Sequence, residues 1–528
     1  MQLDLQNLPN DPALLQQMIL DLLGTLDDHK RQIDQLKHQL AQLRRHQFGR
    51  RSEKIDTGQL LLAFAQLQQA EAQAKAAQRV ANSRPATPPR EKPNGHGRRA
   101  LPEDLPRERI AYPLPEQERI CPDCGQVRDK MGEEVTEQLD YVPTSFVVRQ
   151  HVRIKYACKQ CQANVVTSRM PAQPIEKGIP GPGLLAHVLV SKYADHLPLH
   201  RQESIFRRHG IDLSRSTLCD WVGGCADLLE PLVKAMKAEL VLSHVIQTDD
   251  TPVPVLDATR VGTREGRLWV YVGDADHPYT LFDYTPTRKR DGPAAYLAPY
   301  QGYLQADAYA GYDGIYAGGE VTEVGCWAHA RRKSFDARTS DSRRAHVALA
   351  YIQQLYKVED KARGLDADAR HAMRQEQSRP ILVEFGQWLE AEQMTVLPKS
   401  PMGEAIGYAR RQWAALNRYL DDGRLEIDNN AAERALRAIA IGRKNWLFAG
   451  SDEGGRRAAI IYSLIGTCKR HGVEPFAYLR DVLERVSTHP QSGIAALLPH
   501  HWQAAQDLAA SSGPVQAPSP QPSDAAAD

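Results

Sequence analysis

Glu433 occupies a position that fits two different roles. It lies in the segment IDNNAAERALRAIAIGRKNW, at residues 427–446, where Asn430 and Glu433 have the N-x-x-E spacing of a helix capping box. An acid at this position can instead be a ligand of a metal ion. The segment alone favours the cap, because most glutamates in a first helical turn do nothing more. The choice therefore depends on whether other acids meet Glu433.

Two further acidic positions lie on predicted strands. Asp249 and Asp250 lie within the alternating segment HVIQTDDTPVPVLD, and Asp307 follows GYLQA. Adjacent strand residues point to opposite faces, so only one of Asp249 and Asp250 can enter a shared site, and the alternation does not choose between them. A single aspartate at a strand end is usually a turn or cap residue. Three acids in this order, on two strands and a later helix, favour a shared site instead.

Three converging carboxylates would support phosphodiester chemistry. Two Mg²⁺ ions roughly 3.5 to 4 Å apart can activate a water or a 3′-hydroxyl and stabilise the leaving oxygen during in-line attack. Carboxylates are the hard oxygen ligands that Mg²⁺ prefers, and Mn²⁺ accepts the same ligands. One acid must bridge the two ions, and the dications offset the cost of burying several acids together. The sequence therefore predicts a two-metal site.

The elements that would position these acids follow from periodicity. Alternation predicts strands at residues 244–257, 267–274, 278–284 and 302–307, with a helix at 294–300 before the last strand. Three consecutive strands, a helix and a fourth strand are typical of the start of a ribonuclease-H-like sheet. In that architecture one acid lies on the first strand, a second at the end of the fourth and a third on a later helix. The helical interval at residues 337–423 would then be an insertion in this α/β core.

Basic side chains flank the predicted acids. Those predicted to contact DNA phosphates are His329, Arg331, Arg332, Arg437, Arg443 and Lys444. The first three follow the expected fifth strand, and the other three lie on the helix of Glu433. Arginine offers a planar fork that matches phosphate oxygens. The alternative for Arg437 is an i,i+4 salt bridge with Glu433, which would contribute only a few tenths of a kcal/mol.

Four cysteines have the spacing of a structural zinc site. They form two C-x2-C pairs, at Cys121, Cys124, Cys158 and Cys161. Each pair presents two thiolates to one cation, and two pairs complete a tetrahedral Zn²⁺ site that leaves no position for water or substrate. Strand-like alternation between the pairs predicts a small β module held together by Zn²⁺, and a redox dithiol is the alternative. The other four cysteines have no ligand spacing, and we expect them in core or neutral positions.

Two amphipathic helices are predicted on either side of the sequence HGIDLS. Gly210 permits the turn, and Ser214 can cap the second helix. This spacing is typical of a helix-turn-helix motif, in which Arg215, Ser216 and Thr217 at the start of the second helix would enter a major groove. A plain helical hairpin has the same pattern, so DNA contact is one of two interpretations.

A heptad repeat occupies the N-terminal region. Apolar residues recur every seven positions at Ile19, Leu26, Ile33 and Leu40. We expect a coiled coil of about four heptads between two chains; folding back of the helical run at residues 58–80 is the alternative. The interval that follows is basic, since residues 41–110 contain 14 Lys or Arg against 7 Asp or Glu. This interval is either a flexible arm along a phosphate backbone or a solvated linker.

Length and composition bound the class of protein. A chain of 528 residues with 42% hydrophobic and 25% charged residues is ordinary for a soluble protein of several domains. No apolar run reaches the roughly 18 residues of a membrane span, and the first residues lack a signal pattern, so we expect a cytoplasmic protein without a membrane partner.

The expected fold class is multidomain α+β. The predicted segments are a helical coiled coil at 1–80, a basic Pro/Gly-rich linker at 81–110, a zinc-binding β module at 111–170, a helix-turn-helix DNA-binding region at 171–236, the first part of the ribonuclease-H-like core at 237–336, the helical insertion at 337–423, the second part of the core at 424–490, and a C-terminal segment with a disordered tail at 491–528.

Several motifs follow one another along nearly the whole chain. They are FGRRSEK at residues 48–54, the paired cysteines, PLHRQESIF, SRSTLCDW, DDTPVPVL, ADAYAGYDGIY, CWAHARRKSF and the long segment IDNNAAERALR…GRKNWLFAGSDEGG. Together and in this order they resemble the transposases of the insertion-sequence-66 family. An ordered set of this kind is far more specific than any single motif.

The resemblance implies a DDE transposase that cuts the ends of its own mobile element and joins the 3′ ends to target DNA. It assigns the catalytic and Mg²⁺-binding roles to Asp249, Asp307 and Glu433. In the family the first acid opens an Asp-Glu-Thr string, so Asp250 stands where a glutamate is usual.

The same resemblance implies a bacterial protein associated with the nucleoid. DNA would be its partner, and the heptads together with the need to pair two ends imply at least a dimer. Accessory proteins of the same element are further candidate partners. The alternatives are a transposase-derived DNA-binding protein without catalysis and a ribonuclease-H-like nuclease that never joins ends.

Overall fold

The computed structural model describes residues 172–511, apart from 177, 258 and 260, together with scattered residues within 11–40 and 146–167. The chain divides into two compact units, one formed by Met1–Ala77 and Ala172–Asp528 and the other by Gln78–Pro171. The first unit contains a five-stranded mixed sheet and many helices, so the fold is α+β. Across the described residues, no helix combines the length and the apolar character that a bilayer crossing requires.

The sheet follows the predicted order of elements. Its strands are β3 (Val245–Leu256), β4 (Thr263–Val272), β5 (Thr280–Thr285), β6 (Gly302–Gln305) and β7 (Val321–Val324). Their order across the sheet is β5-β4-β3-β6-β7, with antiparallel pairing among β3, β4 and β5 and parallel pairing among β3, β6 and β7. The short helix α6 (Asp291–Tyr296) precedes β6. The four predicted strands are therefore confirmed, and β7 is the expected fifth strand. A helix before the last predicted strand is also confirmed, but it lies at 291–296 and not at the predicted residues 294–300.

The register of β3 and β6 decides where two of the acids meet. Gln247 of β3 lies opposite Gln305 of β6. The parallel ladder ends at this pair, and Asp249 and Asp307 each follow it by two residues. The topology of the sheet thus places two residues that are 58 positions apart in the chain at the same end of neighbouring strands.

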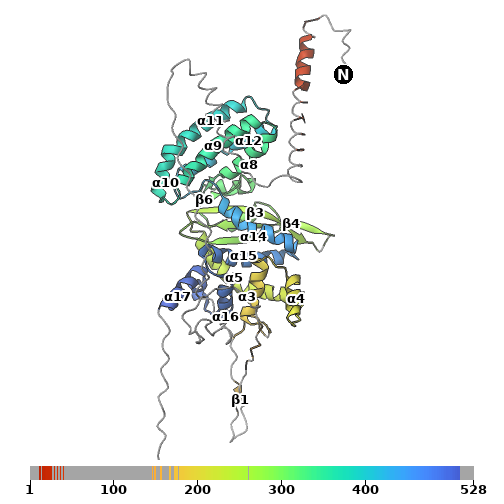
Figure 1. Ribbon diagram of the computed structural model, residues 1–528, viewed down its shortest axis with the longest axis vertical. Coiled ribbons are helices and arrows are strands. Elements are labelled where there is room, and N and C mark those ends of the chain that lie inside the picture. Colours follow the sequence, from red (N-terminus) through yellow and green to blue (C-terminus); the bar gives the residue numbers. More distant parts are fainter. Residues whose placement is uncertain are drawn as a thin grey trace, which may run out of the picture. The chain divides into compact units, whose positions relative to one another are not determined.

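One apolar core joins this sheet to the helices around it. These helices are α3 (Pro182–Tyr193), α4 (Leu199–Arg208), α5 (Arg215–Leu240), α14 (Asn430–Trp446), α15 (Asp452–His471), α16 (Pro475–Arg485) and α17 (Pro499–Ser511). The core includes Ile246, Val270, Leu281 and Leu464, and burying each such side chain stabilises the fold by roughly 1.5–3 kcal/mol. Helix α14 contacts β3, and α15 contacts β5; Figure 1 shows both helices lying along the sheet.

Helix α15 also satisfies polar groups of the edge strand β5. The Ser463 hydroxyl accepts the backbone N–H of Phe282 at 2.8 Å, and the Thr467 hydroxyl accepts that of Thr280 at 3.2 Å. An unpaired strand edge invites association with other chains, and side-chain hydroxyls from a covering helix remove that possibility here.

The predicted pair of helices before the sheet is confirmed. A turn at residues 209–214 joins α4 to α5, and Gly210 in this turn has φ of +76°, which favours glycine. The Ser214 hydroxyl accepts the backbone N–H of Thr217 at 3.1 Å, as the predicted cap requires. Arg215 and Ser216 are exposed and Thr217 is half-buried. Contact of these residues with DNA stays a prediction.

The interval between the fifth strand and the third acid is helical. Its elements are α8 (Trp327–Asp336), α9 (Ser342–Lys361), α10 (Ala367–Met373), a π-helical turn (Arg374–Ser378), α11 (Arg379–Gln393), α12 (Pro401–Arg411) and α13 (Trp413–Asn417). They build a second apolar core, which includes Trp327, Tyr351 and Phe385. Figure 1 shows α9, α11 and α12 grouped together, apart from α5, α15 and α16.

Only scattered parts of the N-terminal and cysteine-containing segments are described. Residues 15–26 are helical, and the heptad side chains of Ile19 and Leu26 are exposed; the coiled coil stays a prediction. In the second unit β1 (Lys155–Tyr156) pairs antiparallel with β2 (Val166–Thr167). The four cysteines of the predicted zinc site lie outside the described residues. Of the other four cysteines, Cys225, Cys326 and Cys468 are buried and Cys219 is exposed.

Candidate active site

Three elements bring the predicted acids within electrostatic reach of one another. Asp249 lies on β3, Asp307 follows β6, and Glu433 lies in the first turn of α14. Burial raises the pKa of Asp249 to about 7, and repulsion by Asp307, Asp250 and Glu433 adds to this rise. A hydrogen bond of 2.8 Å from the backbone N–H of Asp250 to Asp249 Oδ1 opposes it. The Asp249 carboxyl group therefore sits among like charges with little compensation.

The neighbouring Asp250 has a different environment. Its side chain is 2% exposed, and both oxygens accept hydrogen bonds from arginines. Oδ2 accepts from Arg267 Nη1 at 2.9 Å, and Oδ1 accepts from Arg288 Nη2 at 2.8 Å and Nε at 3.1 Å. Two guanidinium groups thus compensate this buried carboxylate within the protein. The structure distinguishes two aspartates that strand alternation could not.

The Glu433 carboxylate faces basic residues of α8. Oε1 lies 3.7 Å from His329 Nε2, and Oε2 lies 3.5 Å from Arg332 Nη2. The alternative salt bridge with Arg437 is absent, and Arg437 is exposed on α14. Oε1 of Glu433 is buried and has no hydrogen-bond partner within the described part of the chain. Leaving such an oxygen unsatisfied costs about 1–3 kcal/mol unless a ligand compensates it.

The predicted capping box at α14 is wrong. The helix begins at Asn430, and the preceding Asn429 makes no side-chain cap. The Asp428 carboxylate instead accepts two hydrogen bonds from Asn430, from its backbone N–H at 3.1 Å and from Nδ2 at 2.7 Å. Because Asp428 satisfies the first N–H of the helix, the Glu433 carboxylate is not used in a cap.

Asp307 is within electrostatic reach of two basic side chains, Arg288 and His329. Its Oδ2 is 3.9 Å from Arg288 Nη2. Burial raises the pKa of Asp307, whereas His329 and Arg288 act in the opposite direction. Burial lowers the pKa of His329 in spite of Glu433 and Asp307 and so favours the neutral imidazole. The Nδ1 atom of His329 is also buried, without a hydrogen-bond partner among the described residues.

Sequence reasoning missed Arg267, Arg288 and Tyr309. The Arg288 guanidinium carbon lies 4.1 Å from the centroid of the Tyr309 ring, so stacking and hydrogen bonding together hold this cation beside Asp307. The available signal was the basic run TRKR after the third predicted strand. Which acid this run reaches depends on the tertiary fold, and strand periodicity carries no information about that.

The other predicted DNA-binding residues near the acids are placed differently. Arg443 Nη1 donates to Thr251 Oγ1 at 3.1 Å and to the carbonyl of Pro252, so Arg443 joins α14 to β3. Arg437 and Lys444 are exposed on α14 and form no ion pair with a described residue. Arg331 lies half-buried on α8, one position before Arg332.

The donor set suits divalent cations in chemical type and in charge. Three carboxylates provide hard oxygen ligands, and a dication would relieve both the repulsion at Asp249 and the unsatisfied oxygen of Glu433. As they stand, no three His, Cys, Asp or Glu side chains within the described part of the chain have a spacing that could hold a metal ion. The side chains of Asp249, Asp307 and Glu433 would therefore have to move closer together on binding.

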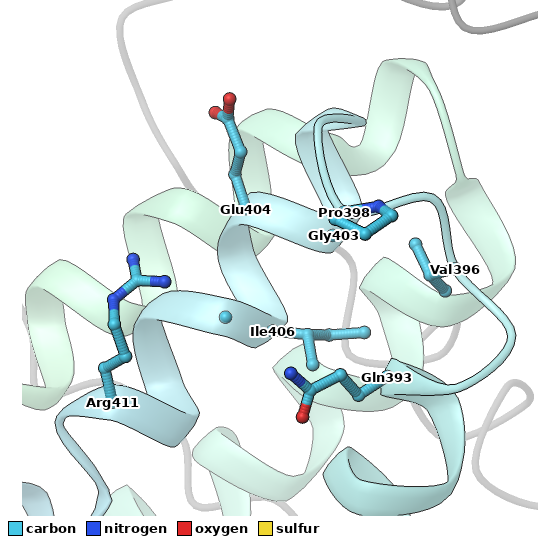
Figure 2. Close-up of a pocket in the computed structure, with 8 residues that line it drawn as sticks. Gln393, Val396, Pro398, Gly403, Glu404, Ile406 and Arg411 are labelled. Atoms are coloured by element: carbon cyan, nitrogen blue, oxygen red, sulfur yellow. The ribbon is translucent and has the colours of Figure 1, made fainter. Parts of the chain in front are cut away.

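A pocket in the helical insertion is separate from the acids. It lies between the end of α11 and α12, has a volume of about 170 Å³ and is lined by residues that include Gln393, Val396, Ile406 and Arg411. Figure 2 shows Glu404 and Arg411 on one side of it and Val396 and Pro398 on the other. None of the three acids lines this pocket, so it does not belong to the candidate site.

Comparison with family models gives the same family for four regions of the chain. Residues 177–457 match the transposase IS66 family, 118–162 match the zinc-finger binding domain of transposase IS66, 463–500 match the IS66 C-terminal element, and 35–110 match a model described as transposase C of IS166 homeodomain. The first match contains all three acids, and the second contains the four paired cysteines.

Curated relatives cover most of the chain. Uncharacterized protein y4hP of Sinorhizobium fredii is 35% identical over 497 residues, which are 89% of each chain. Uncharacterized protein y4qI of the same organism is 35% identical over 491 residues, or 88% of each chain. Uncharacterized protein y4jD is 33% identical over 422 residues, covering 77% of this chain and 82% of the relative.

Proposed function

Because the chain belongs to the IS66 family of transposases, we propose that it is a DDE transposase that binds the ends of its insertion sequence, cleaves the DNA and joins the 3′ ends to target DNA. The catalytic residues are Asp249, Asp307 and Glu433. The observation that carries this proposal is the gathering of three incompletely compensated carboxylates from three separate elements. Acids that serve structure alone are normally compensated, as Asp250 is by its two arginines.

The three acids would hold two Mg²⁺ ions, or Mn²⁺ ions. When bound, these ions would lower the pKa of the attacking water or 3′-hydroxyl and stabilise the leaving oxygen. Arg267 and Arg288 keep Asp250 engaged, so this carboxylate does not compete with Asp249. Asp249 must lose its proton to become a ligand, and because its pKa is about 7, it binds cations better above neutral pH than below.

Basic side chains at the rim of the site would bind the phosphates that flank the scissile bond. Arg288 and Arg332 are partly exposed and lie beside Asp307 and Glu433 respectively. The planar guanidinium group of Arg332 can exchange its contact with Glu433 for two phosphate oxygens. Arg288 stays bonded to Asp250 and would attract phosphate through its charge. The neutral imidazole of His329 can hold or accept a proton at the same edge.

Other parts of the chain would recognise the DNA and assemble the complex. The strand order β5-β4-β3-β6-β7 and the positions of the acids support a ribonuclease-H-like core. The match of residues 118–162 to a zinc-finger domain supports Zn²⁺ binding by the four paired cysteines. The capped second helix supports DNA contact by Arg215, Ser216 and Thr217. The exposed heptad side chains support pairing of two subunits, which would hold the two element ends together.

Incubation of the purified protein with DNA that carries the element's inverted repeats, with and without Mg²⁺, tests the proposal. We expect Mg²⁺-dependent cleavage at the repeat ends and joining to a target plasmid. Asp307→Asn should abolish both reactions and retain end binding. Binding without cleavage by the wild type would indicate a DNA-binding protein, and cleavage of branched DNA without joining would indicate a nuclease. Either result would contradict the proposal.

A further inference from the structure

Three buried amides lie close to the acids and are not used in the proposed chemistry. Gln247, Gln305 and Asn429 expose 7%, 0% and 0% of their surface. Each of them precedes one of the three acids by two to four residues in the chain. The amides therefore sit on the same three backbone segments that carry the site.

Gln247 and Gln305 connect the two strands of the site through their side chains. They lie opposite each other in the parallel pair of β3 and β6, and Gln247 Nε2 donates to Gln305 Oε1 at 3.1 Å. Backbone hydrogen bonds already join these strands, so the amide pair is not needed to form the sheet. Each amide precedes an aspartate by two residues, so the amide pair lies in the sheet directly before the two aspartates.

The same two amides hold the segment that leads into α14. Gln305 Nε2 donates to the carbonyl of Glu426 at 2.7 Å and to that of Gly325 at 3.3 Å. Gln247 Nε2 donates to the carbonyl of Asp428 at 3.2 Å. Gln305 thus links three segments, namely β6, the turn between β7 and α8, and the approach to the helix of Glu433.

Asn429 completes the connection from the helix side. Its Nδ2 donates to the carbonyl of Thr248 at 3.2 Å, one residue before Asp249. Its backbone N–H donates to Cys326 Sγ at 3.5 Å, directly before α8. The first turn of α14 is therefore tied to the strand of the first acid through one fully buried side chain.

These hydrogen bonds are formed at a cost in stability. Gln247 Oε1 and Asn429 Oδ1 are buried, and no described residue forms a hydrogen bond with either oxygen. Apolar side chains of similar shape would pack in the same places without unsatisfied polar atoms. Apolar side chains would not fix the relative positions of β3, β6 and the start of α14, because apolar contacts lack the directionality of hydrogen bonds.

We propose that Gln247, Gln305 and Asn429 are positioning residues that hold β3, β6 and α14 so that the three acids can share a pair of divalent cations. The proposal rests on the proposed function. The amides touch neither the DNA nor the ions, and they act on the acids through the backbone. Loss of Gln305, which makes the largest number of these contacts, is expected to weaken Mg²⁺ binding roughly tenfold or more.

The test compares Gln305→Met with Gln202→Met in the full chain. Gln202 is 1% exposed on α4, and its Nε2 likewise donates to two carbonyls, those of Val188 at 3.3 Å and Leu197 at 3.0 Å. Both variants therefore lose a buried amide with two carbonyl acceptors, and both should unfold at a lower temperature than the wild type. The decisive readout is the rise of the unfolding midpoint with Mg²⁺ concentration, which reports cation affinity without any DNA reaction.

We expect Gln305→Met to need a roughly tenfold higher Mg²⁺ concentration for the same rise of the unfolding midpoint, and Gln202→Met to need the wild-type concentration. The Mg²⁺ concentration for half-maximal cleavage should shift in the same way. Equal titrations for both variants and the wild type would overturn the proposal, whatever the loss of stability. A wild type without any response to Mg²⁺ would contradict the proposed function itself, and this proposal with it. If Gln305→Met does not fold, Gln247→Met replaces it with the same two outcomes, since it leaves the bonds of Gln305 to Gly325 and Glu426 in place.

Discussion

Two clusters of buried charge flank the segment at residues 418–429, and they are built in opposite ways. In the helical insertion, Glu359 accepts hydrogen bonds from Arg374 at 2.7 and 2.8 Å and from Arg370 at 3.1 Å. Arg374 is fully buried, and its remaining N–H groups donate to three backbone carbonyls within residues 418–429, those of Tyr419, Asp422 and Leu425. Every charge in this cluster has partners within the protein.

The acid cluster at the sheet is compensated only in part, by longer contacts of Arg288 with Asp307 and of Arg332 and His329 with Glu433. Asp249 accepts a backbone hydrogen bond and is repelled by its acidic neighbours, and Glu433 Oε1 has no hydrogen-bond partner among the residues that the structure describes. Only Asp250 is compensated as Glu359 is. Buried charges that are compensated within the protein maintain its structure, whereas uncompensated ones are frequent where a ligand of opposite charge binds. The insertion cluster therefore has the character of a structural ion-pair network, and the sheet cluster has the character expected of the proposed metal site.

The largest expected effect is the loss of cleavage in Glu433→Gln. The variant keeps the shape of the side chain but removes a cation ligand, so single-turnover cleavage of end DNA should fall by at least about a thousandfold. The free energy of unfolding in urea should stay the same or rise, because repulsion with Asp249 is removed. Glu390→Gln, an exposed glutamate on α11, is the matched control. Cleavage by Glu433→Gln above a tenth of the wild-type rate would remove Glu433 from the site.

The same substitution in the other cluster should have the opposite consequence. Glu359→Gln leaves Arg374 buried without its counter-charge, and the free energy of unfolding should fall by about 3–5 kcal/mol. Cleavage per folded molecule should remain close to the wild-type value. A loss of stability below about 1 kcal/mol would mean that the insertion cluster does not depend on this ion pair.

Asp249 should make the cation-free protein less stable as the pH rises. Its pKa is about 7 in the folded chain and near 3.8 when unfolded. Between these values the unfolded chain releases the proton first, so the free energy of unfolding falls from pH 4 to 7, by about 3–4 kcal/mol. Asp249→Asn should remove this fall. Urea unfolding of both proteins at pH 4.5, 6 and 8 without Mg²⁺ measures it, and parallel pH curves would show that folding does not raise the pKa of Asp249.

A smaller loss of stability is expected when the hydrogen bond between the helical insertion and the start of α14 is removed. Tyr356 of α9 donates its hydroxyl to Asp428 Oδ2 at 2.7 Å, and Asp428 in turn satisfies the first N–H of α14. Tyr356→Phe should lower the free energy of unfolding by about 1 kcal/mol. Chemical denaturation measures this loss. Unchanged stability would mean that the insertion does not support the start of α14 through this contact.

Local patterns predicted the elements of this fold better than the contacts between them. Alternation predicted the strands from β3 to β6, and local sequence predicted the Ser214 cap. Both predictions succeeded because these features depend on residues that are neighbours in the chain. The capping role assigned to Asn430 was wrong because Asp428, outside the N-x-x-E pattern, reaches the helix N–H. Local pattern also left Asp249 and Asp250 equivalent, since the arginines that separate them, Arg267 and Arg288, lie up to 38 residues away.

The most direct measurement is anomalous diffraction from crystals of the protein with end DNA and Mn²⁺. The account predicts manganese peaks at the C-terminal edge of β6, with carboxylate oxygens of Asp249, Asp307 and Glu433 as ligands and with Asp250 still held by its arginines. Manganese bound without one of these three acids, or absent from this edge in a complex that cleaves DNA, would contradict it.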